Sequence, residues 1–343
     1  MTLLARRFPR LSMVPHVPLA RTTAVQPLRI LSTGGLDLWV KRDDTTADLY
    51  GGNKVRKLEF LLGEARQQGA DTLVTAGAWG SHHVLATTLF GRKWGFDVHA
   101  VMVPQPITDH VESNLRVGLA AGSELHPVRS WPAVVPTTAA LGASLRRDGK
   151  KVYRVPYGGS SATGALGFVE AGLELAAQIE SGECPEPDAI YVALGSGGTA
   201  AGLAIGLAAA GLTTKVVAIR VTPLLVCNRA TVSALVLATM RKLRGIEKAF
   251  PAVSRAALSQ LVIDSSAYAG YGNVDEIVRS TSLKADSEGL HVDPTYTARA
   301  LGAMLRDAHE GRYGKRLLFW LTLSGADLDV RLGDAPGLPS WAA

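Results

Sequence analysis

An apolar run leads into a glycine-rich loop near the middle of the chain. The sequence there reads Ile190-Tyr191-Val192-Ala193-Leu194, and then Gly195-Ser196-Gly197-Gly198-Thr199. Residues 200–209 follow with only alanine, glycine, leucine and isoleucine. Closely spaced glycines let backbone N–H groups approach a phosphate, and the N-terminus of a helix adds its dipole to such a site. This stretch therefore predicts a strand, an anion-binding loop and a helix in succession.

The same alternation of β-rich runs and helical periods continues on both sides of the glycine loop. Strands are expected at 72–76, 97–103, 151–155, 189–194, 215–221 and 316–322. Several of these runs are apolar throughout, as expected when helices cover both faces of a parallel sheet. Helices are expected around 58–65, 163–179, 228–244, 273–288 and 297–309, whereas 127–142 is compatible with a connection or a surface helix. The pattern predicts an α/β doubly wound architecture.

Composition excludes several classes of protein. The chain has 343 residues with 36 basic and 30 acidic side chains, and it is 47% hydrophobic, far from the disordered regime. Its basic residues are scattered, so a small anionic ligand is favoured over nucleic acid. Residues 189–212 carry no charge, but their glycines would break a membrane-spanning helix. Only Cys184 and Cys227 occur, which excludes a disulfide scaffold and favours a reduced, cytoplasmic protein.

A second informative stretch reads Gly51-Gly52-Asn53-Lys54-Val55-Arg56-Lys57 and precedes an amphipathic helix. Asn53 is a good N-cap residue, which would make Lys54 the first helical residue. Three cations in the first turn oppose the helix dipole, and the same field should lower the pKa of a lysine amine. A neutral amine is what Schiff-base chemistry requires. The alternative is a solvated basic helix start, or a patch that attracts phosphate.

The glycine loop by itself allows other interpretations. It lacks the Gly-Lys-Ser/Thr ending of a nucleotide P-loop. Gly195, Gly197 and Ala200 satisfy the Gly-x-Gly-x-x-Ala dinucleotide pattern, and Arg220 stands where a ribose 2′-phosphate would be bound. An NADP-dependent oxidoreductase is therefore a rival hypothesis. Another alternative is that these glycines only let the helix pack closely on the strand.

A third stretch, 77–83, lies between an expected strand and a helix. Ser81 could cap that helix, and exposed N–H groups there could hold a carboxylate. His82 and His83 are adjacent, but adjacent residues rarely converge on one ion, and no other ligands stand at zinc spacing. The sequence also lacks the Gly-x-Ser-x-Gly elbow of serine hydrolases. We therefore expect neither a metal site nor a serine nucleophile.

Taken together, these segments resemble the D-cysteine desulfhydrase / 1-aminocyclopropane-1-carboxylate (ACC) deaminase family of pyridoxal-phosphate enzymes. The resemblance runs from about residue 10 to 325, nearly the whole chain. It is carried by matches at 41–44, 51–60, 69–78, 81, 158–160, 164–167, 195–199, 270–272 and 293–297. The Gly-Gly-Asn-Lys segment is specific, whereas the glycine loop alone is not. The resemblance implies the tryptophan-synthase-β-like fold, with two open twisted α/β domains and the cofactor between them.

The resemblance also implies roles for individual residues. Lys54 would form the Schiff base with pyridoxal phosphate, and Asn53 beside it would be among the cofactor-binding residues. Ser81 would contact the substrate carboxylate and is a candidate to share the proton transfer. Tyr271 and Tyr296 match the two active-site tyrosines of the family. The phosphate would lie in a cradle formed by Gly195, Ser196, Gly197, Gly198 and Thr199.

The chain departs from the family pattern at several positions. His82 stands where the family has an asparagine that hydrogen-bonds the phenolic oxygen of the cofactor, and a histidine could donate a similar bond. Leu85-Ala86 replace an Arg-Gln pair. Thr322 lies in an altered motif near the C-terminus and is a candidate partner of the pyridine nitrogen. Thr297 replaces the glutamate of ACC deaminases, and a neutral partner favours elimination of a good leaving group over ring opening.

The sequence therefore predicts a pyridoxal-phosphate-dependent lyase. It would catalyse α,β-elimination on a small amino acid, D-cysteine or a β-substituted alanine, giving pyruvate and ammonia. The family resemblance alone implies a homodimer. Residues 1–56 with 161–343 would make the larger cofactor-binding domain, and 57–160 the smaller inserted domain. ACC deamination or another reaction of the same cofactor is the first alternative. An NADP-dependent oxidoreductase and a homologue without catalysis are further ones.

Overall fold

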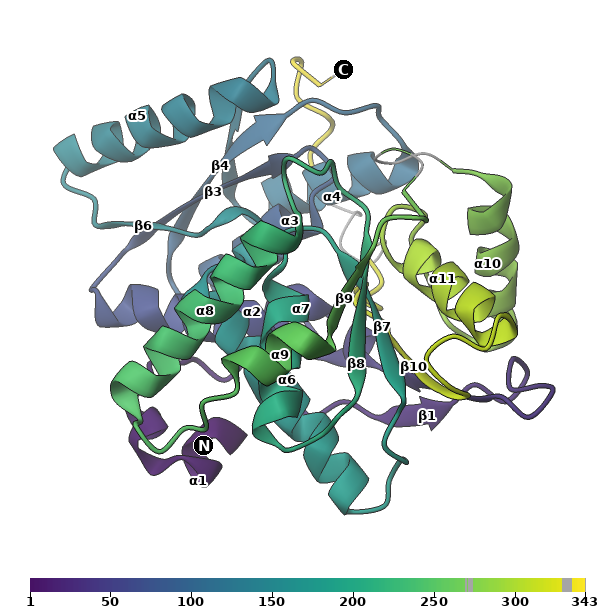
Figure 1. Cartoon of the computed structure of the whole chain (residues 1–343). Coiled ribbons are helices and arrows are strands. Elements are labelled where there is room, and N and C mark those ends of the chain that lie inside the picture. Colours follow the sequence, from purple (N-terminus) through teal and green to yellow (C-terminus); the bar gives the residue numbers. More distant parts are fainter. Residues whose placement is uncertain (269, 271–273, 329–334, 343) are drawn as a thin grey trace.

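The chain folds into two open sheets that are covered by helices (Figure 1). The computed structural model describes residues 1–268, 270, 274–328 and 335–342. Strands and helices alternate along the chain, which confirms the predicted α/β class. The smaller sheet takes all its strands from between residues 72 and 154, and the larger sheet takes its strands from either side of that segment.

Six strands form the larger sheet, in the spatial order β1 (Val25–Pro27), β2 (Asp37–Lys41), β10 (Arg316–Trp320), β7 (Ala189–Leu194), β8 (Lys215–Arg220) and β9 (Leu261–Asp264). All neighbouring pairs are parallel except β1 with β2. Helices α6 (Ala162–Glu180) and α7 (Gly198–Ala209) cover one face, and α10 (Glu276–Ser287) and α11 (Thr297–His309) cover the other. Because both faces are covered, β7 is apolar and buried along its whole length.

Four parallel strands form the smaller sheet, in the order β5 (Ser123–Pro127), β4 (Asp97–Val103), β3 (Thr72–Ala78) and β6 (Val152–Arg154). Helices α3 (His82–Lys93) and α4 (Asp109–Ala120) pack on one face. The chain then returns across the sheet from β5 to β6. Because such crossovers are right-handed, this return places α5 (Val134–Arg147) on the opposite face.

The remaining helices join the two sheets or cover the larger one. Helix α2 (Asn53–Gln67) packs on both α6 and α3, so it contacts elements of both sheets. The predicted boundary between residues 56 and 57 falls inside this helix, and the domain division stays a prediction. Helices α8 (Arg229–Ile246) and α9 (Ser254–Gln260) pack against α7, and α1 (Leu3–Arg7) packs against α6. Short 3-10 turns occur at Pro9–Met13, Asp43–Thr45, Trp131–Ala133 and Tyr157–Gly159.

The uncharged stretch 189–212 consists of the buried strand β7, the half-buried start of the glycine loop, the largely buried helix α7 and three residues after it. Its glycines allow close helix packing, because a Cβ added to Gly206 would lie 2.4 Å from the carbonyl oxygen of Val169 on α6. Among the described residues, no helix is long and apolar enough to cross a membrane.

The predicted strands all exist, but the sequence analysis missed β1, β2, β5 and β9. These strands have three to five residues and are partly exposed, so they lack the continuous apolar run that marks the central strands. Residues 127–142 hold the end of β5, a 3-10 turn and the start of α5. Helix α5 buries only Thr138 and Gly142, which explains why its sequence gave no clear helical pattern.

Candidate active site

A cavity of about 400 Å³ lies where the carboxyl ends of strands from both sheets meet. Ligands bind at this edge of open parallel sheets. Ten of the residues predicted to form the site line the cavity, namely Asn53, Lys54, Ser81, His82, Gly195, Ser196, Gly197, Thr199, Tyr296 and Thr322. Gly198 and Thr297 do not line it, and Tyr271 lies outside the described residues.

The start of α2 fixes the position of Lys54. Gly52 precedes the helix with φ +85°, and a Cβ there would lie 2.6 Å from the carbonyl oxygen of Thr322. Only glycine fits such a position, so Gly52 takes the N-cap place that the sequence analysis assigned to Asn53. Asn53 is instead the first helical residue, and its Nδ2 donates to Oγ1 of Thr199 over 3.2 Å. Its side chain therefore ties α2 to the glycine loop.

The amine of Lys54 lies in the wall of the cavity, in surroundings that favour its neutral form. Burial lowers the pKa of Lys54 to about 8, and the nearby carboxylate of Asp293 partly opposes this shift. The sequence analysis expected a lowered pKa but attributed it to the helix dipole and neighbouring cations. Burial is the main cause, because removing an ammonium group from water disfavours its charged form.

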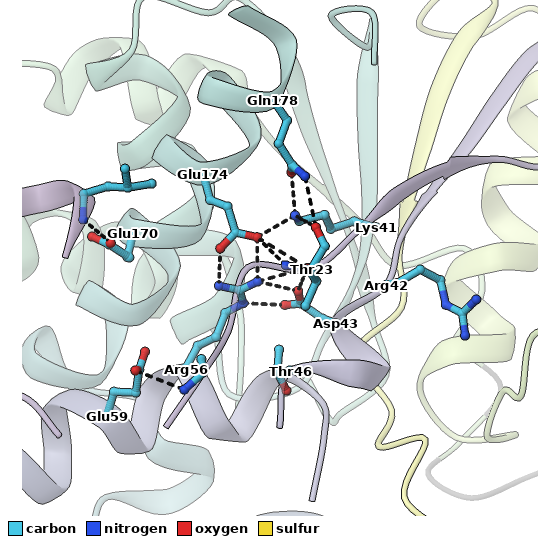
Figure 2. Close-up of polar contacts among 12 residues, drawn as sticks. Thr23, Lys41, Arg42, Asp43, Thr46, Arg56, Glu59, Glu170, Glu174 and Gln178 are labelled. Atoms are coloured by element: carbon cyan, nitrogen blue, oxygen red, sulfur yellow. Dashed lines mark hydrogen bonds and ion pairs between the residues drawn. The ribbon is translucent and has the colours of Figure 1, made fainter. Parts of the chain in front are cut away.

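A buried ion-pair network lies beside the first turn of α2 (Figure 2). Arg56 donates to Asp43 over 2.7 Å and to Glu174 over 2.8 Å, and Lys41 donates to the same Glu174 over 2.6 Å. The two positive charges of Arg56 and Lys41 are therefore balanced by the two negative charges of Asp43 and Glu174. Nε1 of Trp320 also donates to Asp43. Because Arg56 is neutralised in this way, it does not act as one of the three cations that the sequence analysis set against the helix dipole.

The glycine loop has the geometry of an anion site. Gly197 has φ +91° and precedes α7, whose first backbone N–H groups have no acceptor within the helix. Lys57 donates from Nζ to the carbonyl oxygen of Gly158 over 3.1 Å and to Oγ of Ser160 over 3.4 Å. A Cβ added to Gly198 would lie 3.2 Å from that Nζ, so the lysine amine adjoins the loop. The arrangement can hold a phosphate by N–H groups, a helix dipole and the amine of Lys57, whose pKa is held well below its usual value mainly by burial.

Ser81 and His82 enter the cavity from the start of α3. Oγ of Ser81 accepts from the backbone N–H of Val84, which confirms the predicted cap. The hydroxyl of Tyr50 forms a hydrogen bond with Nδ1 of His82. Burial, with His110 and Lys54 nearby, holds the pKa of His82 well below its usual value. His82 is therefore a neutral hydrogen-bonding group at neutral pH.

Tyr296 and Asp293 form the wall contributed by the segment before α11. The ring of Tyr296 packs on the loop, because a Cβ added to Gly195 would lie 3.2 Å from its Cε1. The carboxylate of Asp293 accepts backbone N–H groups of residues 295–297 and the hydroxyl of Thr297 over 2.7 Å. That hydroxyl is committed to Asp293 and lies behind the wall. Thr322 lines the cavity, and its carbonyl oxygen accepts the N–H of residue 53.

Arg220, on which the dinucleotide alternative depended, is used elsewhere. Its guanidinium donates to Oγ of Ser265 over 2.9 Å and to the carbonyl oxygen of Thr222 over 2.7 Å, and it lies 4.6 Å from the ring centroid of Tyr268. Arg220 does not line the cavity. Among the described residues around it, nothing supports a ribose 2′-phosphate site.

Among the lining residues that sequence reasoning missed are the titratable side chains of Tyr50, Lys57, His110 and Asp293. Lys57 and Asp293 stand inside the matching segments but received no role. His110 lies just after β4, and ligand-binding residues are expected behind the carboxyl ends of parallel strands. That rule could have indicated His110. Tyr50 offered no signal, because its partner His82 stands on another element.

Comparisons with known proteins agree with this site. Residues 18–322 match the family described as "Pyridoxal-phosphate dependent enzyme". D-cysteine desulfhydrase of Klebsiella pneumoniae is 33% identical over 342 residues, which cover 97% of this chain and 96% of that protein. Nocardicin C-9′ epimerase of Nocardia uniformis is 34% identical, with 94% of this chain and 97% of that protein covered.

Solved structures give the same result. A crystal structure of an ACC deaminase homologue superposes with a TM-score of 0.78 at 32% identity, covering 92% of this chain and 93% of that one. A tomato (Solanum lycopersicum) threonine deaminase, at 15% identity and a TM-score of 0.60, shares the fold. These matches confirm the predicted fold and the resemblance on which it was based.

The residues present fit the cofactor that this resemblance implies. A glycine loop with an adjoining lysine can hold its phosphate, and a second lysine with an accessible neutral form lies in the same cavity. The family match and the relatives leave no support for an NADP-dependent oxidoreductase. The chain belongs to the family of pyridoxal-phosphate-dependent enzymes, and its cofactor is pyridoxal 5′-phosphate.

Proposed function

We propose that this enzyme catalyses α,β-elimination from a small amino acid, D-cysteine or another β-substituted alanine. For cysteine, the amino acid and one water would give pyruvate, ammonia and hydrogen sulfide. The observation that carries the proposal is the amine of Lys54, whose pKa of about 8 leaves part of it neutral at neutral pH, in one cavity with an anion-binding loop. The identity to a D-cysteine desulfhydrase supports the same reaction class.

The residues that line the cavity would have different roles in the reaction. Pyridoxal phosphate supplies an electron-accepting ring that stabilises negative charge at Cα of the substrate. Lys54 would accept the Cα proton in its neutral form, and the hydroxyl of Ser81 would share that transfer. Oγ of Ser81 accepts only one N–H in the cap, so its own proton stays available for a substrate carboxylate. Tyr296 would cover the reacting centre from the opposite segment.

The surroundings of Thr297 bear on the choice between elimination and ACC deamination. The Thr297 hydroxyl is bonded to Asp293 and lies outside the cavity lining, so it does not supply the acidic partner that a glutamate would give. Thr322 is the proposed neutral partner of the pyridine nitrogen. A less strongly activated ring suits substrates with a good leaving group at Cβ. We therefore place ACC deamination second.

A substrate panel with the purified, cofactor-loaded enzyme tests the reaction. We expect pyruvate from D-cysteine and from β-chloro-D-alanine, and none from serine, whose hydroxide is a poor leaving group. ACC would give 2-oxobutyrate if deamination were the activity, and lactate dehydrogenase with chromatography separates the two keto acids. Absence of pyruvate from every substrate would overturn the proposal, and 2-oxobutyrate from ACC in its place would favour deamination.

Epimerisation is a second candidate, because one relative at 34% identity is named as an epimerase. It begins with the same removal of the Cα proton by Lys54 but keeps the Cβ substituent. Incubation of single enantiomers in deuterium oxide, followed by chiral chromatography, distinguishes it. Inversion with deuterium at Cα and no pyruvate would favour epimerisation.

We also propose that the enzyme is a cytoplasmic homodimer. Leu224, Leu225 and Val226 are consecutive exposed apolar residues, with Leu225 95% exposed, as expected of an interaction surface. Cys184 and Cys227 are both buried and free, which suits a reducing compartment. Light scattering coupled to size-exclusion chromatography gives the mass directly, and a monomer at micromolar concentration would contradict the dimer.

A further inference from the structure

Tyr50 and His82 form a hydrogen-bonded pair in the wall of the cavity. Tyr50 directly precedes the Gly-Gly-Asn-Lys segment and is 1% exposed, whereas His82 begins α3. The hydroxyl of Tyr50 is hydrogen-bonded to Nδ1 of the His82 imidazole. Both side chains line the same cavity as Lys54. The pair therefore joins the segment that carries the reactive lysine to the start of α3.

The direction of this hydrogen bond follows from what else each group contacts. In the described part of the chain, the Tyr50 hydroxyl has no other hydrogen-bond acceptor, and water hardly reaches it. Burial raises the pKa of Tyr50, so the phenol keeps its proton. A buried O–H must find an acceptor, and only Nδ1 of His82 is available. The hydroxyl therefore donates, and Nδ1 accepts.

A neutral imidazole with an accepting Nδ1 carries its proton on Nε2. No described residue forms a hydrogen bond with Nε2, and the half-buried ring faces the cavity. His110 packs on the ring with centroids 4.5 Å apart, and Nε2 of His110 lies 3.2 Å from the carbonyl oxygen of Gly80. This packing limits rotation of the His82 ring.

We propose that Tyr50 is a positioning residue that fixes the tautomer of His82, so that its Nε2–H is the donor presented to the cavity. The role of that donor towards the phenolic oxygen of the cofactor rests on the proposed function. The tautomer itself does not, because it depends only on residues of this chain. Without the tyrosine hydroxyl, Nδ1–H and Nε2–H forms would compete, and part of the enzyme would present an acceptor instead of a donor.

The first test is nitrogen-15 NMR of the cofactor-free protein labelled at histidine. His82→Asn identifies the resonances of His82 among the eight histidines. We expect a protonated Nε2 in the wild type and a mixture of tautomers in Tyr50→Phe. Tyr153→Phe is the matched control, because it removes a hydroxyl bonded to Glu64 away from the cavity. A protonated Nδ1 in the wild type, or an unchanged tautomer in Tyr50→Phe, would overturn the proposal.

The second test connects the tautomer to cofactor binding. Tyr50→Phe should shift the absorption band of the bound cofactor and weaken its affinity about five- to tenfold, which is the size of one lost hydrogen bond. In a His82→Asn background, Tyr50→Phe should have almost no effect on the absorption band or the affinity. The asparagine amide donates in any case, because it has no tautomers to be fixed. Equal effects in both backgrounds would contradict the proposed role. Failure of the proposed reaction would leave both readouts intact.

An independent observation concerns three side chains on the edge of the smaller sheet. His99 on β4 and Glu124 on β5 are paired in register, and His126 lies two residues further on the same face. Nδ1 of His99 lies 3.1 Å from Nε2 of His126 and 3.4 Å from Oε2 of Glu124. Ligands at 2.0–2.1 Å from a tetrahedral zinc ion are about 3.3 Å apart, so these spacings suit one ion.

We infer that His99, Glu124 and His126 bind a divalent transition-metal ion such as Zn²⁺. Their ligand atoms all lie within 4.8 Å of one another. Two imidazoles and a carboxylate form a common ligand set, and the exposed Glu124 leaves room for water as a further ligand. The sequence analysis expected no metal because it weighed only His82, His83 and ligands at zinc spacing. His99 and His126 are distant in sequence, and only the parallel pairing of β4 and β5 brings them together.

Isothermal titration of the cofactor-loaded enzyme with Zn²⁺ tests this site. We expect one ion at micromolar affinity, and at least tenfold weaker binding in both His126→Ala and Glu124→Gln. His309→Ala, at the exposed end of α11, is the control and should bind as the wild type does. Binding weaker than millimolar, or binding that His126→Ala leaves unchanged, would overturn the assignment.

Discussion

Two cations in the first turns of α2 have opposite surroundings. Arg56 is fully paired, since both Asp43 and Glu174 accept from its guanidinium, and these carboxylates raise its pKa well above the usual value (Figure 2). Lys54 lies two residues earlier on the same helix. Among the described residues, no carboxylate forms an ion pair with it, and burial lowers its pKa to about 8.

The difference separates a structural charge from a reactive one. A buried charge is tolerated when partners satisfy it, and removing one partner leaves an uncompensated charge in a poorly solvated place. Arg56 and Lys41 share such partners, so their network holds α2 in place. Lys54 has no such partner and is therefore free to lose its proton. The paired network thus fixes the helix that carries the reactive amine.

The largest effect is expected from Lys54→Ala. Activity should fall at least a thousandfold, because the group proposed to bind the cofactor and move the Cα proton is lost. The free energy of unfolding should stay constant or rise, since a desolvated, unpaired amine is removed. Borohydride reduction and peptide mapping of the wild type should place the cofactor mass on Lys54. A mass on another lysine, or more than a tenth of the activity in the variant, would contradict this assignment.

Glu174→Gln removes the carboxylate that Arg56 and Lys41 share. It leaves Lys41 without a carboxylate and Arg56 with only Asp43, so we expect a loss of about 3–5 kcal/mol in the free energy of unfolding. Urea denaturation measures this loss. Glu180→Gln is the control, because its pair with Arg7 is exposed and should contribute less than about 1 kcal/mol. If both variants lose similar free energy of unfolding, the buried network contributes no more to stability than an exposed ion pair.

Lys57→Met tests whether the second unpaired lysine serves the phosphate. Its amine adjoins Gly198 and donates only to Gly158 and Ser160, neither of them charged. A hydrogen bond to a charged group contributes about 1.5–3 kcal/mol, so cofactor affinity should fall roughly 10- to 150-fold. Fluorescence titration of the cofactor-free protein gives the dissociation constant. Lys93→Met, at the end of α3, should leave that constant unchanged.

The sequence predicts the parts of this molecule that depend on local pattern. The buried central strands, the glycine loop and the cap at Ser81 follow from residues close together in the chain. The side-chain pairs that give the site its chemistry do not follow from local pattern. Arg56 meets Glu174 across 118 positions, and Tyr50 meets His82 across 32. Such contacts depend on how α2, α3 and α6 pack, which periodicity does not encode.

One local expectation, the cap at Asn53, failed for a physical reason that only coordinates reveal, and the surroundings of Thr297 were also not foreseen. Asn53 is a better cap by preference, but the carbonyl oxygen of Thr322 lies so close that only glycine fits at the cap position. Thr297 was predicted among the cofactor-binding residues; its hydroxyl is bonded to Asp293, and the residue does not line the cavity. At the cap position the deciding neighbour, Thr322, is distant in sequence, whereas Asp293 stands only four residues before Thr297.

The smallest effect is a shift with pH in the reactivity of Lys54. With a pKa of about 8, the neutral fraction of its amine should rise about tenfold between pH 7 and 9 and then level off. An ordinary lysine, with a pKa near 10.4, would rise about a hundredfold over that range without a plateau. The rate at which pyridoxal phosphate attaches to the cofactor-free protein should follow the first curve. If the attachment rate still rises steeply at pH 10, Lys54 is as solvated as a surface lysine. The contrast between a reactive Lys54 amine and a paired Arg56 would then no longer hold.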